Sequence, residues 1–410
     1  RGGAQGVRPL KIAHIVRRFS RAEWGGTETV VAALAREQRA RGHDPRVFCT
    51  DALQDGAGGA DAARVARFGY FYPYWPLSKA ARRALDKKGG NPFAFGLFRA
   101  VAAWRPDVIH VHAGGRLAAC AVRLGERLGA PTAISLHGGA AVVPQEELEQ
   151  MLRPLRRTLP YGGVLDRILG LRFDPLARAS AVLALSRAEV ARLKARYPKQ
   201  RIEHVPNGID LGGQEGPERP ERREGRAPFA RLLCVSRIDY QKNQLALLDL
   251  LAAEPACALT LVGPVTADWY AAKIRARAKA LGLEGRVTLV PGLPPDSPRL
   301  AEAYAAADVF VLPSLHEPFG IVALEAMRAG LPLLAANVGG LPDFVKDGEN
   351  GLLFDPSRPE TLVAAYRRLT PACAARLAVN GRATAAAYAW PALAERLTAL
   401  YRDLVGGARR

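Results

Sequence analysis

The sequence alternates short apolar segments with longer amphipathic ones, and this alternation runs through the chain twice. In the first half, β-branched and aliphatic runs predict strands at residues 11–16, 45–49, 107–111, 132–136, 181–185 and 202–205. Helical periodicity predicts helices between them, such as 28–41, 116–128 and 187–197. Strands that alternate with helices indicate a parallel sheet covered by helices.

A second series predicts strands at residues 230–235, 258–262, 287–290, 309–312, 333–336 and 351–354, followed by a helix-rich tail. Between the two series, residues 211–228 are mostly Gly, Pro, Glu and Arg and offer little to bury. We therefore expect an α/β protein of two doubly wound, Rossmann-like domains that face each other across a cleft. Ligands of such sheets bind outside the carboxyl ends of the strands.

These patterns also set the expected boundaries. The first domain spans residues 1–208, a linker spans 209–228, and the second domain spans 229–388. The last helix, 389–410, is expected to pack back toward the first domain.

Composition excludes several protein classes. With 49% hydrophobic and 24% charged residues, the 410-residue chain is neither disordered nor collagen-like. Its five cysteines are scattered and never at C-x-x-C spacing, which favours a reducing compartment. No apolar run reaches the roughly 18 residues of a spanning helix, and no signal peptide is visible. We expect a cytoplasmic protein.

Positive charge is concentrated in the first half. Residues 1–200 hold 33 Lys and Arg against 16 Asp and Glu, whereas residues 201–410 hold 25 against 23. Such an asymmetry is typical of a surface that meets an anionic partner; the alternative is that the arginines are merely solvated.

One dense stretch, residues 314–353, carries most of the chemistry. It follows a predicted strand and begins a helix near Gly320, so that unpaired amides at a helix N-terminus are available to an anion. Glu317 lies before this helix and Glu325 about one turn inside it. Carboxylates beside an anion site suit hydrogen bonding to sugar hydroxyls. The amides in question belong to Phe319, Gly320, Ile321 and Val322.

The spacing E-P-F-G-I-V-x-x-E from Glu317 to Glu325 resembles the retaining glycosyltransferases of the GT-B fold in glycosyltransferase family four, the group 1 transferases. The resemblance covers nearly the whole chain. Its further motifs, in the family's order, are GGTE (25–28), DVIHVH (107–112), SLHGG (135–139), VPNGID (205–210) and VSRIDYQKN (235–243).

The resemblance implies a hexosyltransferase with a nucleotide-diphosphate sugar as donor, UDP being the expected nucleotide, and no cofactor. Arg237 and Lys242 would meet the phosphates and stabilise negative charge as the diphosphate leaves. Glu317 would hold hydroxyls of the donor sugar, and Glu325 those of the ribose. The catalytic set would be His137, Glu317, Arg237 and Lys242.

The first domain contributes a glycine pair and histidines. Gly25 and Gly26 precede a helix and would let the backbone approach the donor. His137 follows a predicted strand and matches the family's histidine that contacts the donor sugar. His110 and His112 share one face of a strand, and at least one of them is expected to be packed.

Retention of configuration needs no enzymic nucleophile if the leaving phosphate accepts the proton of the acceptor, as is commonly inferred for the family. No D-x-D occurs in the sequence. Because Arg237, Lys242 and helix amides supply positive charge, we expect no metal to be required.

The acceptor, a glycan, a lipid-linked sugar or a small molecule, is expected on the side of the first domain. Aromatic residues crowd into positions 68–75 before a basic helix, which suits either an anionic membrane surface or packing on the same domain. Candidate residues are Tyr72, Trp75, Lys79, Arg82, Arg83, Arg153, Arg156 and Arg157, the last three forming an expected helical face. Two alternatives stay open: sugar-nucleotide epimerisation and a non-catalytic basic binding module. Nucleic acid is not an expected partner.

Overall fold

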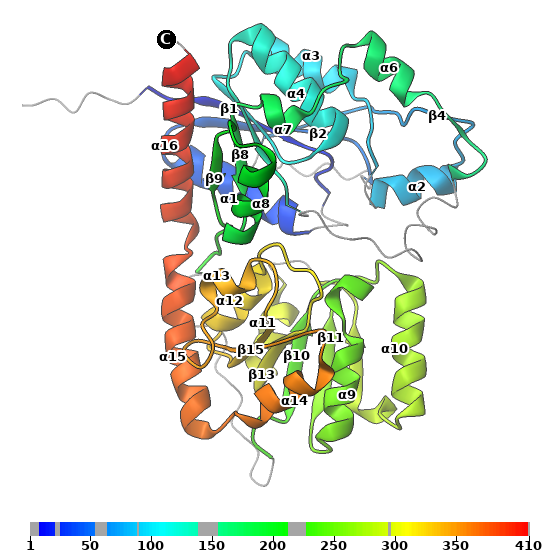
Figure 1. The fold of residues 1–410 in the computed structure, drawn as a ribbon, viewed down its shortest axis with the longest axis vertical. Coiled ribbons are helices and arrows are strands. Elements are labelled where there is room, and N and C mark those ends of the chain that lie inside the picture. Colours follow the sequence, from blue (N-terminus) through cyan, green and yellow to red (C-terminus); the bar gives the residue numbers. More distant parts are fainter. Residues whose placement is uncertain are drawn as a thin grey trace, which may run out of the picture. The chain divides into compact units, whose positions relative to one another are not determined.

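The computed structural model describes residues 8–20, 25–53, 64–87, 90–137, 155–211, 227–293 and 297–408. The chain divides into two compact units, each with its own sheet and helices (Figure 1). The first unit contains Arg1–Leu185, Glu189–Val205 and Trp390–Arg410, and the second contains Ser186–Ala188 and Pro206–Ala389.

The sheet of the first unit has seven parallel strands in the order β3-β2-β1-β5-β6-β8-β9. Its strands are β1 (Lys11–Val16), β2 (Asp44–Thr50), β3 (Val65–Phe68), β5 (Val108–Val111), β6 (Thr132–Ser135), β8 (Ala181–Ala184) and β9 (Ile202–His204). A separate antiparallel pair joins β4 (Tyr74–Trp75) to β7 (Leu159–Pro160).

Helices cover this sheet. They are α1 (Gly26–Ala40), α2 (Lys79–Lys87), α3 (Phe95–Trp104), α4 (Gly115–Leu128), α6 (Gly162–Ile168), α7 (Pro175–Arg178), α8 (Arg187–Arg196) and α16 (Trp390–Ala408). The last helix, α16, contacts α1 and buries Leu393, Leu397 and Tyr401 (Figure 1). The C-terminal helix is thus part of the first unit.

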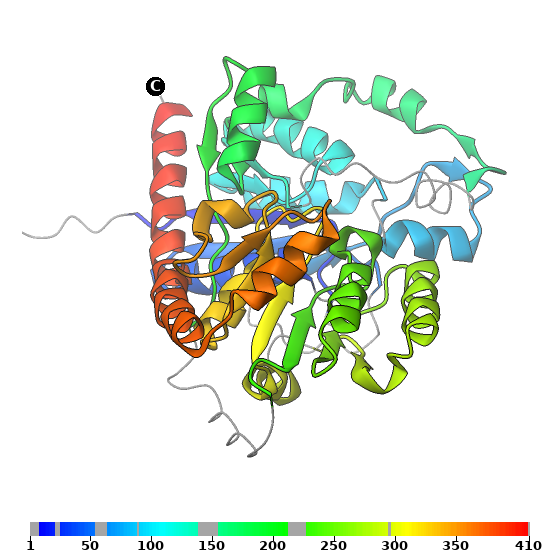
Figure 2. The same ribbon diagram turned by 60° about the horizontal axis from the view of Figure 1, so that its bottom comes forward.

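The second unit has six parallel strands in the order β12-β11-β10-β13-β14-β15. Its strands are β10 (Arg231–Val235), β11 (Ala258–Val262), β12 (Val287–Val290), β13 (Val309–Leu312), β14 (Leu333–Ala336) and β15 (Leu352–Phe354). Its helices, seen on both faces of the sheet in Figure 2, are α9 (Leu245–Ala253), α10 (Asp268–Ala280), α11 (Pro298–Ala306), α12 (Ile321–Arg328), α13 (Leu341–Phe344), α14 (Pro359–Arg367) and α15 (Pro371–Ala387), with 3-10 turns η2 (Tyr240–Lys242) and η3 (Glu284–Arg286).

Both sheets are doubly wound, which confirms the predicted fold class. The central strands are buried on both faces, so they read as continuous apolar runs rather than as alternating patterns. Strand order reverses between β1 and β5 in the first unit and between β10 and β13 in the second. Polar groups that follow these strands lie at the points where such sheets bind ligands.

Three strands differ from the sequence-based expectation. The strands β3, β4 and β7 were not expected; β3 lies at a sheet edge, and the other two contain only two residues each. Most of the expected linker, residues 212–226, lies outside the described residues.

None of the described helices combines the length and the apolar composition that a bilayer span requires.

Candidate active site

In the second unit, polar residues gather where the strand order reverses. Lys242 ends the 3-10 turn η2 that follows β10, and Glu317 lies in the loop that follows β13. Because β10 and β13 are parallel neighbours, their carboxyl ends bring these two residues together although 75 positions separate them.

Lys242 and Glu317 form an ion pair. Lys242 Nζ donates to Glu317 Oε2 at 2.7 Å, and only 12% and 9% of the two side chains is exposed. Ser314 Oγ donates to the same oxygen at 3.1 Å. The carboxylate is therefore fixed by two donors, as a group must be if it is to orient a ligand.

Arg237 lies nearby in the sequence but is more exposed. Its guanidinium pairs with the buried Asp239 at 3.0 Å, while 47% of its side chain remains accessible. Gln244 Nε2 donates to the Arg237 carbonyl at 2.7 Å and braces the loop. An anchored but accessible guanidinium is suited to bidentate binding of a phosphate.

Helix α12 begins at Ile321, as expected, after Gly320. Gly320 has φ of +97°, and a Cβ there would come within 2.6 Å of Leu341 Cδ2, so this position requires glycine. Gly339 approaches still more closely, because an added Cβ would lie 1.9 Å from the Glu317 carbonyl oxygen. The turn at 338–340 therefore packs backbone to backbone on the Glu317 loop.

The side chain of Phe319 is buried against Phe344 and Tyr388, so that only its backbone is a candidate for ligand contact.

Glu325 lies one turn inside α12. It accepts a hydrogen bond from the Tyr304 hydroxyl at 2.9 Å. Burial raises the pKa of Glu325, and the bond from Tyr304 opposes part of this rise. Glu325 is thus a partly desolvated, oriented carboxylate and not a solvated group on an open helix face.

In the first unit, α1 begins directly after Gly25, whose backbone is extended. Glu28 is buried in the first helical turn and pairs with Arg18 at 3.4 Å. Burial raises the pKa of Glu28, against the attraction of Arg18. The N-terminus of α1, at Gly25 and Gly26, thus follows β1 at the point where the strand order of the first sheet reverses.

His137 lies just beyond β6, at the same edge of the sheet. Its Nε2 is 2.9 Å from His112 Nδ1, and its Nδ1 is buried with no hydrogen-bond partner among the described residues. Burial lowers the pKa of His137 to about 4, so the ring is neutral near pH 7. His110 and His112 are both buried, and the expectation that at least one is packed is confirmed.

The structure corrects the prediction for Tyr72. Tyr72 is 4% exposed, and its hydroxyl donates to Asp86 Oδ1 at 2.9 Å. Tyr70 donates to the same oxygen, and Phe71 stacks on Phe93. Most of the aromatic segment thus packs on its own unit, and Tyr72 is not available to an acceptor or a membrane.

The prediction that Arg153, Arg156 and Arg157 share a helical face is wrong for Arg156 and Arg157, the two that the structure describes. Arg156 and Arg157 are exposed in a turn before β7, and Arg153 lies outside the described residues. Of the other candidates, Trp75 is 68% exposed, and Lys79, Arg82 and Arg83 are exposed on α2.

Sequence reasoning missed several residues that hold the candidate groups in place. Ser314 and Asp239 are ordinary polar residues in the sequence, and although their partners Glu317 and Arg237 lie only three and two positions away, no periodic pattern marks these loop contacts. The contact between His14 and the β5 histidine could have been predicted, because His14 lies directly opposite His110 once β1 and β5 are aligned as parallel neighbours.

Comparison with known proteins gives two matching family models. The model of the family described as Glycosyl transferases group 1 matches residues 220–372. The model described as Glycosyltransferase Family 4 matches residues 24–212.

Individual relatives match across most of the chain. A D-inositol 3-phosphate glycosyltransferase of Segniliparus rotundus is 33% identical over 75% of this chain and 68% of its own length. That of Acidothermus cellulolyticus is 30% identical over 94% of this chain and 87% of its own length.

Solved structures share the fold. HepE of Anabaena, in complex with UDP and glucose, matches with a TM-score of 0.69 and 21% identity over 96% of this chain and 100% of its own. Sucrose-phosphate synthase of Thermosynechococcus elongatus matches with a TM-score of 0.71 and 24% identity over 97% and 100%. The chain therefore belongs to glycosyltransferase family 4, the glycosyl transferases group 1, and has the GT-B fold.

Proposed function

We propose that this glycosyltransferase moves a hexosyl group from a UDP-sugar to a hydroxyl acceptor with retention of configuration and without a metal. The observation that carries the proposal is the Lys242–Glu317 pair at the switch point of the second sheet, beside the start of α12. The names of structural neighbours that bind UDP or UDP-glucose support the choice of nucleotide.

Positive charge in the second unit suits a departing diphosphate. An ammonium group has three donors, so Lys242 can keep its bond to Glu317 and also reach a phosphate oxygen. Arg237 offers an accessible guanidinium, and the first amides of α12 add a partial positive charge. Such preorganised groups stabilise charge as it develops on the leaving group.

Retention follows if attack and departure occur on one face of the sugar. The bond from the anomeric carbon to the diphosphate oxygen breaks, and the acceptor oxygen forms the new bond. The acceptor proton passes to the leaving phosphate. In this scheme Glu317 holds sugar hydroxyls, Glu325 holds the ribose, and His137 contacts the sugar.

The acceptor is proposed from the relatives. Their names make D-inositol 3-phosphate the first acceptor to test, before glycans and lipid-linked sugars. Screening UDP-, GDP-, ADP- and TDP-sugars for thermal stabilisation identifies the donor, because a ligand of the folded state raises its stability. Mass spectrometry of the product then tests the reaction, since neither epimerisation nor simple binding makes a new glycosidic bond.

Lys242→Ala and Glu317→Ala should each reduce turnover about 100- to 1000-fold, as for other groups that stabilise developing charge. The measurement is initial rate at saturating donor. Lys279→Ala and Glu302→Ala, which remove exposed charges on α10 and α11, serve as matched controls and should keep normal rates. Glu317→Gln keeps a hydrogen-bonding side chain beside Lys242 if the alanine variant is unstable. Normal turnover in both folded variants would contradict the assignment.

Glu325 should confer a preference for ribose over deoxyribose. UDP should bind about 10- to 150-fold more tightly than 2′-deoxy-UDP, since a hydrogen bond to a charged group contributes about 1.5–3 kcal/mol. Glu325→Ala should lose this preference while Glu302→Ala keeps it. Isothermal titration calorimetry measures both ligands. An unchanged preference in Glu325→Ala would place the ribose elsewhere.

Activity should survive excess EDTA, and the first product should keep the anomeric configuration of the donor. The reason is that Arg237, Lys242 and the α12 amides carry out the charge stabilisation that a metal supplies elsewhere. Proton NMR of the first-formed product reports the configuration. Inversion, or a chelator-induced loss that Mg²⁺ restores, would refute this scheme.

We also propose a peripheral contact with anionic membranes through Trp75 and the exposed basic residues of α2. Binding to phosphatidylserine vesicles should weaken with salt, because exposed charges are screened over roughly 8 to 10 Å near physiological ionic strength. Replacing Lys79, Arg82 and Arg83 with Gln should cost at most about 1 kcal/mol per charge. Co-sedimentation that is equal on neutral and anionic vesicles, or absent on both, would show that this surface is merely solvated.

A further inference from the structure

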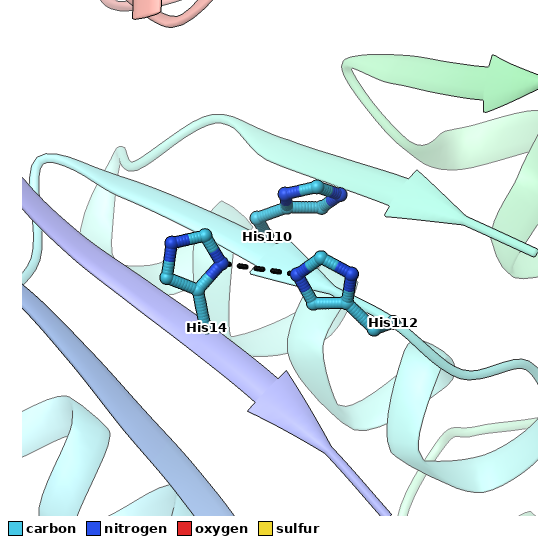
Figure 3. A group of neighbouring side chains, drawn as sticks. All are labelled: His14, His110 and His112. Carbon is cyan, nitrogen blue, oxygen red and sulfur yellow. Dashed lines mark hydrogen bonds between the residues drawn. The ribbon is translucent and has the colours of Figure 1, made fainter. Parts of the chain in front are cut away.

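The first unit buries a group of histidines from separate strands. His14 lies on β1, His110 lies on β5, His112 directly follows β5, and all three are at most 5% exposed. Figure 3 shows the three rings together, with the hydrogen bond between His14 and His112. The proposed transfer scheme uses none of them.

His14, His112 and His137 form a continuous hydrogen-bonded chain with Gln38 of α1. Gln38 Oε1 is 2.8 Å from His14 Nε2, and His14 Nδ1 is 3.0 Å from His112 Nε2. His112 Nδ1 is in turn 2.9 Å from His137 Nε2. The chain therefore runs from a fully buried amide to the histidine proposed to contact the sugar.

The rings in this chain are neutral. Burial lowers the pKa of His14 to about 4 and holds that of His112 well below its usual range. His137 is lowered to about 4 by the same cause. A neutral imidazole has one nitrogen that donates and one that accepts.

These rules give the chain a direction. A carbonyl oxygen can only accept, so His14 must donate from Nε2 to Gln38 and is left with a bare Nδ1. His112 must then donate from Nε2 to His14, and His137 must donate from Nε2 to His112. The last bare nitrogen is His137 Nδ1, which is buried and has no partner among the described residues.

We propose that Gln38, His14 and His112 are positioning residues that hold His137 in its Nε2–H tautomer, so that Nδ1 accepts a hydrogen bond from a sugar hydroxyl. The proposal rests on the proposed function for its ligand but not for the chain itself. It explains why a neutral ring with an unpaired nitrogen is held beside the carboxyl end of β6.

A metal ion is the other candidate for this cluster. One ring nitrogen from each of His14, His110 and His112 lies within 4.8 Å of the others. However, every ring nitrogen of these residues already has a hydrogen-bond partner; for His110 these are Ser135 Oγ at 2.8 Å and the Tyr401 hydroxyl. A metal would have to displace at least one such bond at each ligand, so the hydrogen-bonded chain is favoured.

NMR of the ligand-free protein tests the chain directly. In protein labelled with ¹⁵N-histidine, long-range proton–nitrogen spectra distinguish protonated from bare ring nitrogens. Single His→Phe variants assign the signals. His14, His112 and His137 should all carry the proton on Nε2. An Nδ1–H tautomer at His137, which the reverse orientation of the Gln38 amide would produce, overturns the proposal, as does stoichiometric zinc after EDTA dialysis.

Variants test the consequence for turnover. Gln38→Met keeps the length of the side chain but removes the acceptor, so the His137 tautomers should become mixed. We expect kcat to fall about 10- to 100-fold, by analogy with the hydrogen-bond partners of metal-ligating histidines, with KM for the donor nearly unchanged. Ser135→Ala, the matched control, breaks the His110 bond in the same cluster and should leave both the tautomer and kcat intact.

The two hypotheses fail separately. If no donor is turned over, the proposed function fails while the tautomers of the ligand-free protein still decide whether the chain exists. If transfer occurs but Gln38→Met matches Ser135→Ala in kcat, the positioning role is refuted and the transferase remains.

Discussion

Parallel strands buried on both faces impose the constraint on which this protein depends. Their backbone groups hydrogen bond to neighbouring strands and their side chains pack in the core. Polar side chains that could bind a ligand are therefore found mainly at the strand ends. In the second unit this leaves one favourable place, between β10 and β13, where the chain diverges to opposite sides of the sheet. Lys242, Glu317 and the start of α12 all lie there. The glycines at 339 and 340 hold that loop by backbone contact, which no side chain would permit.

The histidine chain departs from this confinement. His14 brings a polar ring into the sheet itself and His112 directly follows β5, and these buried rings are tolerated because each of their ring nitrogens is hydrogen bonded. Leaving one such group unpaired in the interior would cost about 1–3 kcal/mol. A continuous hydrogen-bonded chain avoids that cost at every ring nitrogen except the outermost, His137 Nδ1, while at the inner end Gln38 Nε2 has no partner among the described residues.

The strands of both sheets were predictable because their apolar runs are short, bounded by turn residues and repeated at regular spacing. β13 and β14 have the bounds that the sequence predicts. The two-residue strands β4 and β7 were not predictable, since such short pairs carry no periodic signal. For the site, the sequence and its family resemblance singled out Lys242 and Glu317 but gave no sign of their direct pairing, which depends on strand order. The prediction for Tyr72 was wrong because the sequence of an aromatic run does not show whether its side chains face solvent or the interior. Here the Tyr72 hydroxyl donates to the buried Asp86.

The return of α16 to the first unit makes that unit discontinuous in the sequence, while nearly all of the second unit is inserted within it. A chimera that exchanges the second unit between related enzymes would therefore need two splice points, near residues 205 and 389, rather than one. The order of synthesis is affected as well. During translation all strands of the first sheet are synthesised before the second unit, but α1 keeps an uncovered apolar face until the helix that begins at Trp390 has left the ribosome, after the second unit is complete.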